Sequence, residues 1–354
     1  MGTQPGTILV TGGAGFIGSN FLLGTVGGGR ARVVTLDKLT YAANKDNLAP
    51  LDGDERHTFV QGDVGDRGLV LSLLRAHRPQ AIVHFAAESH VDRSIDGPGA
   101  FVHTNVVGTF ELLEATRAWL AEAGEGTRES FRFVHVSTDE VFGSLGPTGL
   151  FREDTPYAAS SPYSASKAAS DLFVRAYHRT YGVPTITVNS TNAYGPHQFP
   201  EKLVPLMVLG CLEGRPLPVY GDGGNVRDWI FVQDLCDGLH AALLHGRPGE
   251  SYLFGARNEQ TNLDMVHAIC DVFDDLHGAE PGTSRRLVTF VADRPGHDRR
   301  YAVDPGRAER ELGWRAAVPF REGLRRTVSF YLDNPAWCAA VQARYARERL
   351  GLGK

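Results

Sequence analysis

Residues 7–23 have the sequence TILVTGGAGFIGSNFLL, in which a glycine-rich loop joins two apolar stretches. The β-branched residues of Thr7–Thr11 predict a buried strand, and Ser19–Leu23 predicts the start of a helix. Glycine lets a backbone approach a phosphate closely, and a helix N-terminus offers N–H donors to an anion. The strand–loop–helix order with G-x-x-G-x-x-G spacing therefore predicts a dinucleotide-binding turn rather than a tight turn alone.

Five more apolar stretches continue the strand pattern through the N-terminal part of the chain. They are Arg32–Leu36, Thr58–Gln61, Ala81–Phe85, Phe131–Val136 and Thr185–Asn189. Helical periodicity separates them, most clearly over Asn105–Ala121. Because strands that are covered by helices on both faces lack a polar side, this pattern predicts an α/β fold with a doubly wound parallel sheet of the Rossmann type.

After about Tyr194, glycine and proline interrupt shorter segments, which indicates a second, smaller α/β unit. Ile230–His245 predicts a strand and a helix that rejoin the first unit, and a closing helix is expected near Pro335–Leu350. The expected cofactor-binding and substrate domains consist, in that order, of residues 1–193 with about 226–252, and of residues 194–225 with 253–354.

The composition excludes several classes of protein. The net charge is −5, so the chain lacks the basic character of a nucleic-acid-binding protein. No apolar run approaches the length of a membrane span, and the N-terminus lacks a signal-peptide pattern. The 4 cysteines lack the spacing of a metal site and indicate free thiols in a reducing compartment. We therefore expect a cytoplasmic protein with no metal and no nucleic-acid or membrane partner.

The glycine loop and the ends of the following strands supply the candidate cofactor-binding residues. Asp37 ends the second strand, where its carboxylate can accept hydrogen bonds from ribose hydroxyls and repel a 2′-phosphate, which favours NAD over NADP, although Lys38 beside it weakens that preference. Asp63 is expected to meet the adenine edge or, alternatively, to cap the following helix. Ala86 and Ala87 form a floor for the dinucleotide or pack on the first helix. The other candidates are Gly12, Gly15, Phe16, Ile17, Gly18, Val64 and Ser137.

Tyr163 and Lys167 are the candidate hydride-transfer pair, because a spacing of 4 places them on one face of a helix. A phenol is a weak base, since its pKa is about 10, but a nearby ammonium and a positive nicotinamide lower that pKa. The pair, which also binds the cofactor, can then take a proton from a substrate hydroxyl as hydride leaves the same carbon. Ser137 or Thr138 would hydrogen-bond to that oxygen. A chance pair on a surface helix is the alternative.

Asp139 and Glu140 follow Thr138 directly and are more discriminating. Adjacent carboxyl groups at a strand end can belong to a solvated turn or a cap. Beside the nicotinamide, however, their repulsion tends to keep one ionised and the other protonated, which suits a base and an acid acting on neighbouring carbons. A reaction that oxidises, eliminates water and then reduces needs both carboxyl groups, whereas a plain dehydrogenase does not.

The chain resembles the extended short-chain dehydrogenases/reductases and, within them, the dTDP-glucose 4,6-dehydratases. The resemblance runs from the first strand to about residue 304, so it covers almost the whole chain. The matching motifs are TGGAGFIGSNF, LDKLTYAANKDNL, HFAAESHVDRSI, NVVGTFELLEA, STDEVFG, PYSASKAASD, TNAYGPHQFPEKLVPL, LPVYGDGGNVRDWIFVQD and DRPGHDRRYA.

This resemblance implies a three-stage reaction on dTDP-glucose with bound NAD. Tyr163, aided by Lys167, would take the proton of the C4 hydroxyl while hydride passes from C4 to NAD⁺. Glu140 would then remove the C5 proton while Asp139 protonates the departing C6 hydroxyl. Hydride would return to C6 and C5 would be reprotonated, which gives a 4-keto-6-deoxy sugar nucleotide and regenerates NAD.

The resemblance also implies the substrate-binding residues. Ser89 and His90 would lie near the hexose, and Asn192 would touch the sugar or its diphosphate, whereas Asp92 and Arg93 pair structurally. The segments expected to embrace the base contain Glu201, Lys202, Leu203, Pro218, Val219 and Tyr220, and the diphosphate clamp contains Arg227, Asn262, Arg294 and His297. From the residues alone, each clamp member is an ordinary surface side chain.

A homodimer is also implied, through a four-helix bundle built from Asn105–Ala121 and the helix that carries Tyr163. Two positions depart from the family pattern: Phe142 replaces a common Tyr, and Ala193 replaces a common Asn, so each removes a polar group near the site. The alternative functions are a 4-epimerase or a dehydratase of UDP- or GDP-sugars, and a non-catalytic NAD(H)-sensing module. The paired carboxyl groups argue against an epimerase, and the intact hydride pair argues against a sensor.

Overall fold

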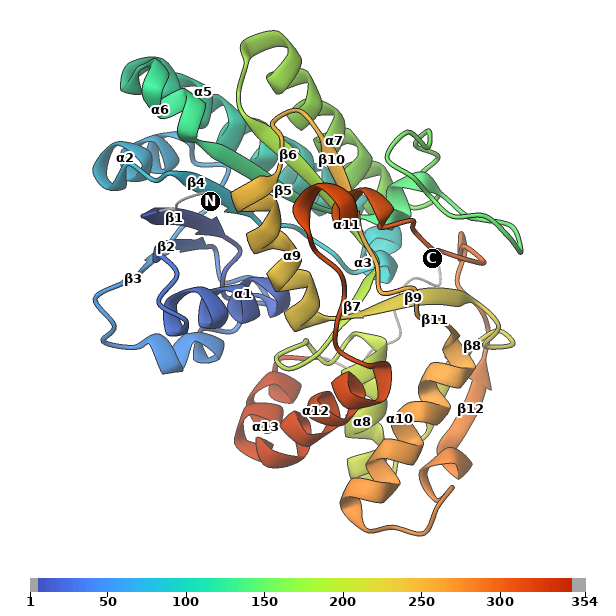
Figure 1. Ribbon diagram of the computed structural model, residues 1–354. Helices are drawn as coiled ribbons and strands as arrows, with labels where there is room; N and C mark the ends of the chain where they lie inside the picture. Colours follow the sequence, from blue (N-terminus) through green and yellow to red (C-terminus); the bar gives the residue numbers. More distant parts are fainter. Residues whose placement is uncertain (1–5, 346–354) are drawn as a thin grey trace.

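The computed structural model describes residues 6–345 and arranges much of the chain around one large parallel sheet (Figure 1). Its strands lie in the order β10-β6-β5-β4-β1-β2-β3, and all neighbouring pairs are parallel. They are β1 (Thr7–Thr11), β2 (Arg32–Asp37), β3 (His57–Gln61), β4 (Ala81–His84), β5 (Arg132–Thr138), β6 (Thr185–Ser190) and β10 (Ser251–Phe254). The predicted doubly wound α/β fold is confirmed.

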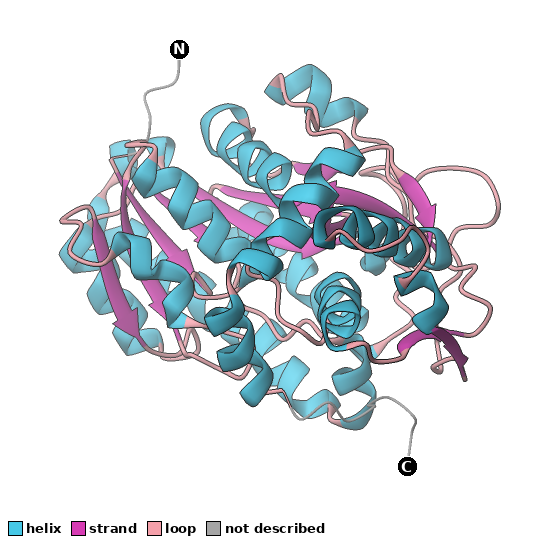
Figure 2. Ribbon diagram, turned by 90° about the horizontal axis from the view of Figure 1, so that it is seen from below, coloured by secondary structure: helices cyan, strands magenta, loops and turns pink. Residues whose placement is uncertain are grey.

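Helices cover both faces of this sheet (Figure 2). One face carries α2 (Arg67–His77), α5 (Thr109–Ala123) and α7 (Pro162–Tyr181), and the other carries α1 (Phe16–Gly27), α9 (Val232–His245) and α11 (Gly306–Leu312). The central strands β4 and β6 are buried at every position, as expected for strands that helices cover on both faces. Shorter elements of this part are η1 (Lys45–Leu51), α3 (Val91–Asp96), α4 (Pro98–Phe101), η2 (Val102–Gly108), α6 (Glu125–Ser130) and η3 (Asp139–Phe142).

A second group of elements packs beside the carboxyl ends of the sheet and lies below it in Figure 1. Its helices are α8 (Leu203–Glu213), α10 (Asn262–His277), η4 (Ser284–Leu287), α12 (Phe320–Asp333) and α13 (Pro335–Ala343). Its two small sheets pair β12 (Val288–Val291) with β8 (Leu217–Tyr220), and place β9 (Val226–Phe231) between β11 (Glu259–Thr261) and β7 (Asn192–Tyr194). This group has its own apolar core, to which Met265, Ile269 and Leu324 contribute.

The strand order reverses at β1, which has β2 on one side and β4 on the other. The loops that leave the carboxyl ends of these strands diverge, and a crevice at such a point is where open α/β sheets bind ligands. The glycine loop follows β1, and Phe85 follows β4. A Cβ added to Gly12 would lie 2.6 Å from the backbone nitrogen of Ala86, so the two loops are in contact at this point.

The bounds of several elements differ from the sequence-based expectations. β5 continues to Thr138, because its last residue still pairs with Ser190 of β6. The helix expected over Asn105–Ala121 begins earlier, with the π-helical segment η2, and ends at Ala123. The closing helix ends at Ala343, and the rest of its expected range beyond residue 345 lies outside the described residues. Within residues 6–345, no helix is both long and apolar enough to span a membrane.

Replacing Gly12 by alanine should destabilise the fold. Gly12 has a φ of +71°, and this left-handed conformation costs an L-residue about 1–2 kcal/mol before the clash with Ala86 is counted. A Cβ on Gly27, at the end of α1, would have no heavy atom of the described chain within 4 Å. We therefore expect Gly12→Ala to lower the Tm by several degrees, whereas Gly27→Ala keeps it or raises it slightly. Equal melting temperatures for the two variants would contradict this account.

Candidate active site

A cavity of about 300 Å³ lies at the reversal point of the sheet and continues past the carboxyl end of β5. It brings together residues that come from widely separated parts of the sequence. The predicted residues that line it are Gly12, Gly15, Phe16, Ile17, Gly18, Asp37, Lys38, Asp63, Val64, Ala86, Ala87, Ser89, Ser137, Thr138, Asp139, Glu140, Tyr163, Lys167, Asn192, Glu201 and Lys202.

The glycine loop is held in place by Asp37. One oxygen of this buried carboxylate accepts from the backbone N–H of Ala14 at 2.9 Å, and the other accepts from that of Leu39 at 2.8 Å. Burial raises the pKa of Asp37, and the two backbone hydrogen bonds oppose that shift. Gly15 caps α1 without a side-chain hydrogen bond, so the first-turn N–H groups are available to an anion. These features fit a dinucleotide diphosphate.

Asp63 forms an ion pair with Lys38 at 2.6 Å and accepts from the N–H of Gly65 at 2.9 Å. Burial raises the pKa of Asp63, but the hydrogen bonds from Lys38 and Gly65 outweigh burial and lower it. The alternative that Asp63 caps the next helix is wrong, because Asp66 caps α2 by accepting from the N–H of Leu69. The charge of Lys38 is therefore compensated by Asp63. Asp37 can still repel a 2′-phosphate, which favours NAD over NADP.

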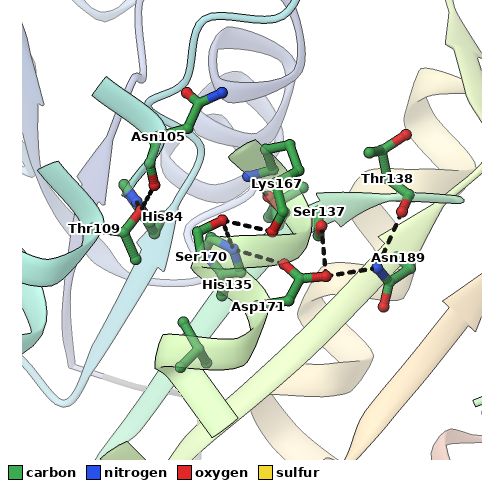
Figure 3. A network of polar contacts seen from close by, with 12 residues as sticks. His84, Asn105, Thr109, His135, Ser137, Thr138, Lys167, Ser170, Asp171 and Asn189 are labelled. Carbon is green, nitrogen blue, oxygen red and sulfur yellow. Dashed lines mark hydrogen bonds and ion pairs between the residues drawn. The ribbon is translucent and has the colours of Figure 1, made fainter. Parts of the chain in front are cut away.

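Tyr163 and Lys167 lie in α7, which begins at Pro162, and both side chains are buried. Lys167 Nζ donates to the carbonyl of Val136 at 2.9 Å. Burial lowers the pKa of Lys167 to about 8, and Asp171 opposes the shift. Figure 3 shows Lys167 next to the end of β5 together with Ser137 and Thr138.

The pKa of Tyr163 is raised in the protein alone, contrary to the lowering expected from Lys167. Burial is the largest cause and the charge of Glu140 the second, while a hydrogen bond with Thr138 acts the other way. The ammonium of Lys167 is already bonded to a backbone carbonyl, and carboxyl groups surround the phenol. A positive charge beside the phenol, such as a bound nicotinamide ring would supply, would lower the pKa of Tyr163.

The two carboxyl groups differ in their surroundings. Burial and the neighbouring Glu140 raise the pKa of Asp139 well above its usual value, which favours its protonated form. Burial also raises the pKa of Glu140, but Arg294, Arg227 and Lys202 favour its ionised form. Asp139 is thereby suited to donate a proton and Glu140 to accept one.

Thr138 fixes the turn that carries both groups. Its hydroxyl accepts from the N–H of Glu140 and donates to Asp139 Oδ1, each at 3.3 Å. The other oxygen of Asp139 is buried without a hydrogen-bond partner among the described residues. The cap that we considered as an alternative does exist, but Thr138 supplies it, and the carboxyl groups themselves line the cavity.

The remaining substrate-binding candidates lie outside the lining of this cavity. They are His90, Leu203, Pro218, Tyr220, Arg227, Asn262, Arg294 and His297. His90 caps α3, and Leu203 packs against the second apolar core. Asn262 begins α10, and Pro218 lies in β8.

The proposed clamp residues are connected to one another around Glu140. Arg294 donates to Asp92 at 2.6 Å, and the Tyr220 hydroxyl donates to the other oxygen of Asp92 at 2.9 Å. Arg227 donates to the carbonyl of Asp298 at 2.9 Å and stacks over Tyr301. The Nε of Arg294 is buried without a partner among the described residues. The charges of Arg294 and Arg227 favour the ionised form of Glu140.

Asp92 and Arg93 do not pair with each other. Asp92 pairs with Arg294, and Arg93 donates to Glu201 at 2.9 Å while its guanidinium stacks on the ring of Tyr41. Glu201 also accepts from the Tyr41 hydroxyl at 2.9 Å. The charge of Glu201 is therefore compensated by Arg93. Any contact between Glu201 and a nucleobase is limited to the hydrogen bonds that Arg93 and Tyr41 leave available.

Several cavity residues were missed by the sequence analysis: Leu36, Thr40, Ala42, Ala43, Gly62, Phe85, Glu88, Thr104, Val136, Ser190, Thr191, Gln198 and Phe199. Ser190 and Thr191 follow the predicted strand β6, so the rule that strand ends line ligand sites could have identified them. Thr104 lies in the π-helical segment, which hydrophobic periodicity does not reveal. Of the two departures, Ala193 lines the cavity, whereas Phe142 packs against Phe151 and Tyr157 outside it.

Comparisons with known proteins agree with this geometry. A family model described as GDP-mannose 4,6 dehydratase matches residues 9–327. A dTDP-glucose 4,6-dehydratase of Xanthomonas campestris pv. campestris (strain B100) is 55% identical over 98% of this chain and 99% of its own length. The chain belongs to the dTDP-glucose 4,6-dehydratase family. A relative with the same name from Escherichia coli (strain K12) is 48% identical over 95% of each chain.

A solved member of the family is DesIV of Streptomyces venezuelae, a dTDP-glucose 4,6-dehydratase whose structure has NAD and TYD bound. It is 47% identical, with a TM-score of 0.86, and the match covers 95% of this chain and 99% of that chain. Family membership and the cavity agree on NAD as the cofactor, because the uncapped α1 and the Asp37-braced loop form the corresponding dinucleotide site. The chain is an NAD-dependent hydro-lyase.

Asp139→Asn should stabilise the protein at alkaline pH. The pKa of Asp139 is higher in the folded chain than in the unfolded chain. The stability that the protonated carboxyl group contributes is therefore complete below the unfolded pKa and is lost as the pH rises through the folded pKa. An asparagine has no charge to bury, so the variant should gain more stability at pH 8 than at pH 5.

Urea unfolding at the two pH values measures this difference. Asp154→Asn, at an exposed position, is the matched control and should give the same small change at both. A loss of stability of Asp139→Asn at pH 8, or a gain that does not depend on pH, would mean that Asp139 is ionised in the folded protein.

Proposed function

We propose that this chain converts dTDP-glucose to dTDP-4-keto-6-deoxyglucose with bound NAD. One observation carries the proposal: a buried acid whose pKa is raised, Asp139, and a carboxylate surrounded by cations, Glu140, share a cavity with the hydride pair Tyr163 and Lys167. Oxidation alone would use only the pair. Elimination of water between two neighbouring carbons uses an acid and a base as well.

Each of these residues has a separate role in the proposed reaction. Tyr163 takes the proton of the C4 hydroxyl, and Thr138 hydrogen-bonds to the same oxygen. Glu140 removes the C5 proton, which the 4-keto group has made acidic, and Asp139 protonates the C6 hydroxyl as it leaves. NAD, when bound, accepts the hydride from C4 and supplies it to C6, and C5 is reprotonated. Lys167 keeps a positive charge beside the reacting oxygen, so the phenolate of Tyr163 is favoured once the cofactor is present.

The nucleotide end of the substrate is proposed to lie on the side of Arg227 and Arg294. Both guanidinium groups lie close enough to Glu140 to influence its ionisation, and the buried Nε of Arg294 lacks a partner among the described residues. Arginine suits a diphosphate because it can donate two parallel hydrogen bonds. His297 and Asn262 complete the proposed clamp, with Glu201, Lys202, Leu203, Pro218 and Tyr220 near the base, and Ser89, His90 and Asn192 near the hexose.

A time course followed by proton NMR tests the proposed function. The protein is mixed with dTDP-glucose or UDP-glucose, first without added NAD and then with it. A new C6 methyl signal with dTDP-glucose is expected, and its appearance before NAD is added would show that the cofactor is retained. A galactose-type product without a methyl signal would identify a 4-epimerase. A preference for UDP-glucose would overturn the assignment of thymine as the nucleobase of the substrate. No reaction with NAD present would favour a sensing module.

Glu140→Gln should block elimination while leaving some oxidation at C4. The amide cannot take the C5 proton, so the reaction should stop after the first hydride transfer and absorbance of NADH at about 340 nm should accumulate, with dehydration slowed about 100-fold or more. Glu153→Gln is the control, because Glu153 is a partly buried carboxyl group outside the cavity lining. Normal dehydration by Glu140→Gln would remove Glu140 from its role.

A dimer is proposed through α5, α7 and the π-helical segment η2. Four apolar side chains on η2 and α7 are exposed, namely Val102 (52%), Val107 (39%), Leu172 (53%) and Phe173 (39%). These elements pack against one another, so the side chains share one surface that a second copy can cover.

The two apolar cores are likewise proposed to correspond to a cofactor domain and a substrate domain, and the free, buried cysteines support a cytoplasmic location.

Leu172→Glu should shift the protein from dimer to monomer, because it places a charge in the centre of the apolar surface. Light scattering after size exclusion measures the mass. Leu212→Glu is the control: Leu212 is 40% exposed and lies in α8, away from the proposed interface. If both variants stay dimeric, the interface lies elsewhere; if the unmodified protein is a monomer, the proposed dimer is wrong.

A further inference from the structure

Asp171 is a buried acid that the proposed reaction does not use. It lies in α7, four residues after Lys167 and eight after Tyr163, so all three share one face of the helix. Its residue exposure is 1%, and it does not line the cavity, whereas Ser137, Thr138 and Lys167 do. Figure 3 shows its carboxylate directed at the end of β5.

Four polar groups from three parts of the chain converge on this carboxylate. Oδ2 accepts from the hydroxyl of Ser137 at 2.9 Å, from the hydroxyl of Tyr157 at 2.9 Å and from Asn189 Nδ2 at 3.0 Å. Oδ1 lies 3.1 Å from His135 Nε2. Two of these partners belong to β5, Asn189 belongs to β6, and Tyr157 precedes α7. A single charged side chain thus joins the helix of the hydride pair to the two strands beside it.

The hydrogen bonds of this network determine where its protons lie. The hydroxyl of Ser170 donates to the carbonyl of Lys167 at 2.8 Å, so toward His135 Nε2, 3.3 Å away, it can only accept. His135 Nε2 therefore carries the hydrogen and donates to Asp171. Burial lowers the pKa of His135 to about 4, which keeps the ring neutral. Burial raises the pKa of Asp171, but hydrogen bonds from His135 and Ser137 and the charge of Lys167 outweigh burial and keep the carboxylate ionised.

The network continues to the residues that perform the chemistry. Asn189 Nδ2, which donates to Asp171, also donates to the carbonyl of Thr138 at 3.0 Å. That carbonyl belongs to the peptide bond between Thr138 and Asp139. Lys167 binds the carbonyl of Val136, two residues earlier on the same strand. Side-chain and backbone groups at three consecutive positions of β5, from 136 to 138, are therefore fixed from α7, two of them through Asp171.

We propose that Asp171 is a positioning residue for the dehydration reaction, whose carboxylate holds Ser137 and, through Asn189, the Thr138–Asp139 peptide against the helix that carries Tyr163 and Lys167. The proposal rests on the proposed function. A displacement of about 1 Å between reacting groups can reduce a rate by about 100-fold, so a residue that never touches the substrate can still control the chemical step. The residue is not interchangeable with asparagine, because an amide presents only one acceptor oxygen: if that oxygen stays with Ser137, Tyr157 and Asn189, the amide N–H groups face the Nε2–H donor of His135.

The test uses Asp171→Asn in the full-length protein, with dTDP-glucose as substrate. We expect kcat to fall about 100-fold while KM changes less than about threefold, because binding groups keep their places and only the reacting groups shift. The deuterium isotope effect on kcat with C4-deuterated substrate should increase, since hydride transfer becomes slower relative to the other steps. Tyr177→Phe is the matched control: it removes a hydroxyl–carboxylate hydrogen bond, to Glu114 at 2.7 Å, from the same helix outside the network.

Each outcome is decisive. A normal kcat and an unchanged isotope effect in folded Asp171→Asn would overturn the proposal, and so would an equal loss in Tyr177→Phe. If Asp171→Asn does not fold, Asn189→Ala replaces it, because this variant leaves Asp171 with three donors and cuts only the link to Thr138; the same loss of kcat is expected, and a normal kcat would overturn the proposal. If the unmodified protein forms no 4-keto-6-deoxy product, the proposed function has failed instead.

Discussion

The burial of Asp139 beside Glu140 is the constraint around which the rest of the site is arranged. Two carboxyl groups in adjacent positions, removed from water, cannot both be ionised without a large electrostatic penalty. The structure resolves this by surrounding Glu140 with Arg227, Arg294 and Lys202, while Asp139 is left with an unpaired oxygen and a raised pKa. The proposed division into acid and base rests on this distribution of positive charge, which comes from the second group of elements.

The same constraint explains why the chain needs both groups of elements around one cavity. The large sheet positions the dinucleotide site, because the chain leaves β1 and β4 toward opposite faces of the sheet at the point where the strand order reverses. The cations come from β9 and from the segment after β12, which meet the sheet near the end of β5. Ion pairs such as Asp92–Arg294 and Arg93–Glu201 join the two groups, so the alignment of carboxyl groups and cations is built into the contact between them.

Much of the fold could be predicted from local sequence, since six strands of the large sheet and the glycine loop have patterns confined to a few residues. The positions of Asp139, Glu140, Tyr163 and Lys167 in one cavity also followed, because strand ends and helix faces are periodic features. Asp171 could not be recognised, because its importance comes from Ser137, Tyr157 and Asn189, which approach it only in the folded chain. For the same reason the sequence did not reveal that Asp92 binds Arg294, 202 positions away. The raised pKa of Tyr163 was also missed, because burial cannot be judged from a motif.

The most direct test of the mechanism follows one deuterium atom. dTDP-glucose deuterated at C4 is converted in the presence of an equal amount of unlabelled substrate, and NMR and mass spectrometry locate the label in the product. If the oxidation at C4 and the reduction at C6 share one cavity and one retained cofactor, the deuterium appears in the C6 methyl group of the molecule that lost it. Deuterium that is lost to solvent, or that returns to C4 of an epimer, would contradict the assignment of Asp139 and Glu140.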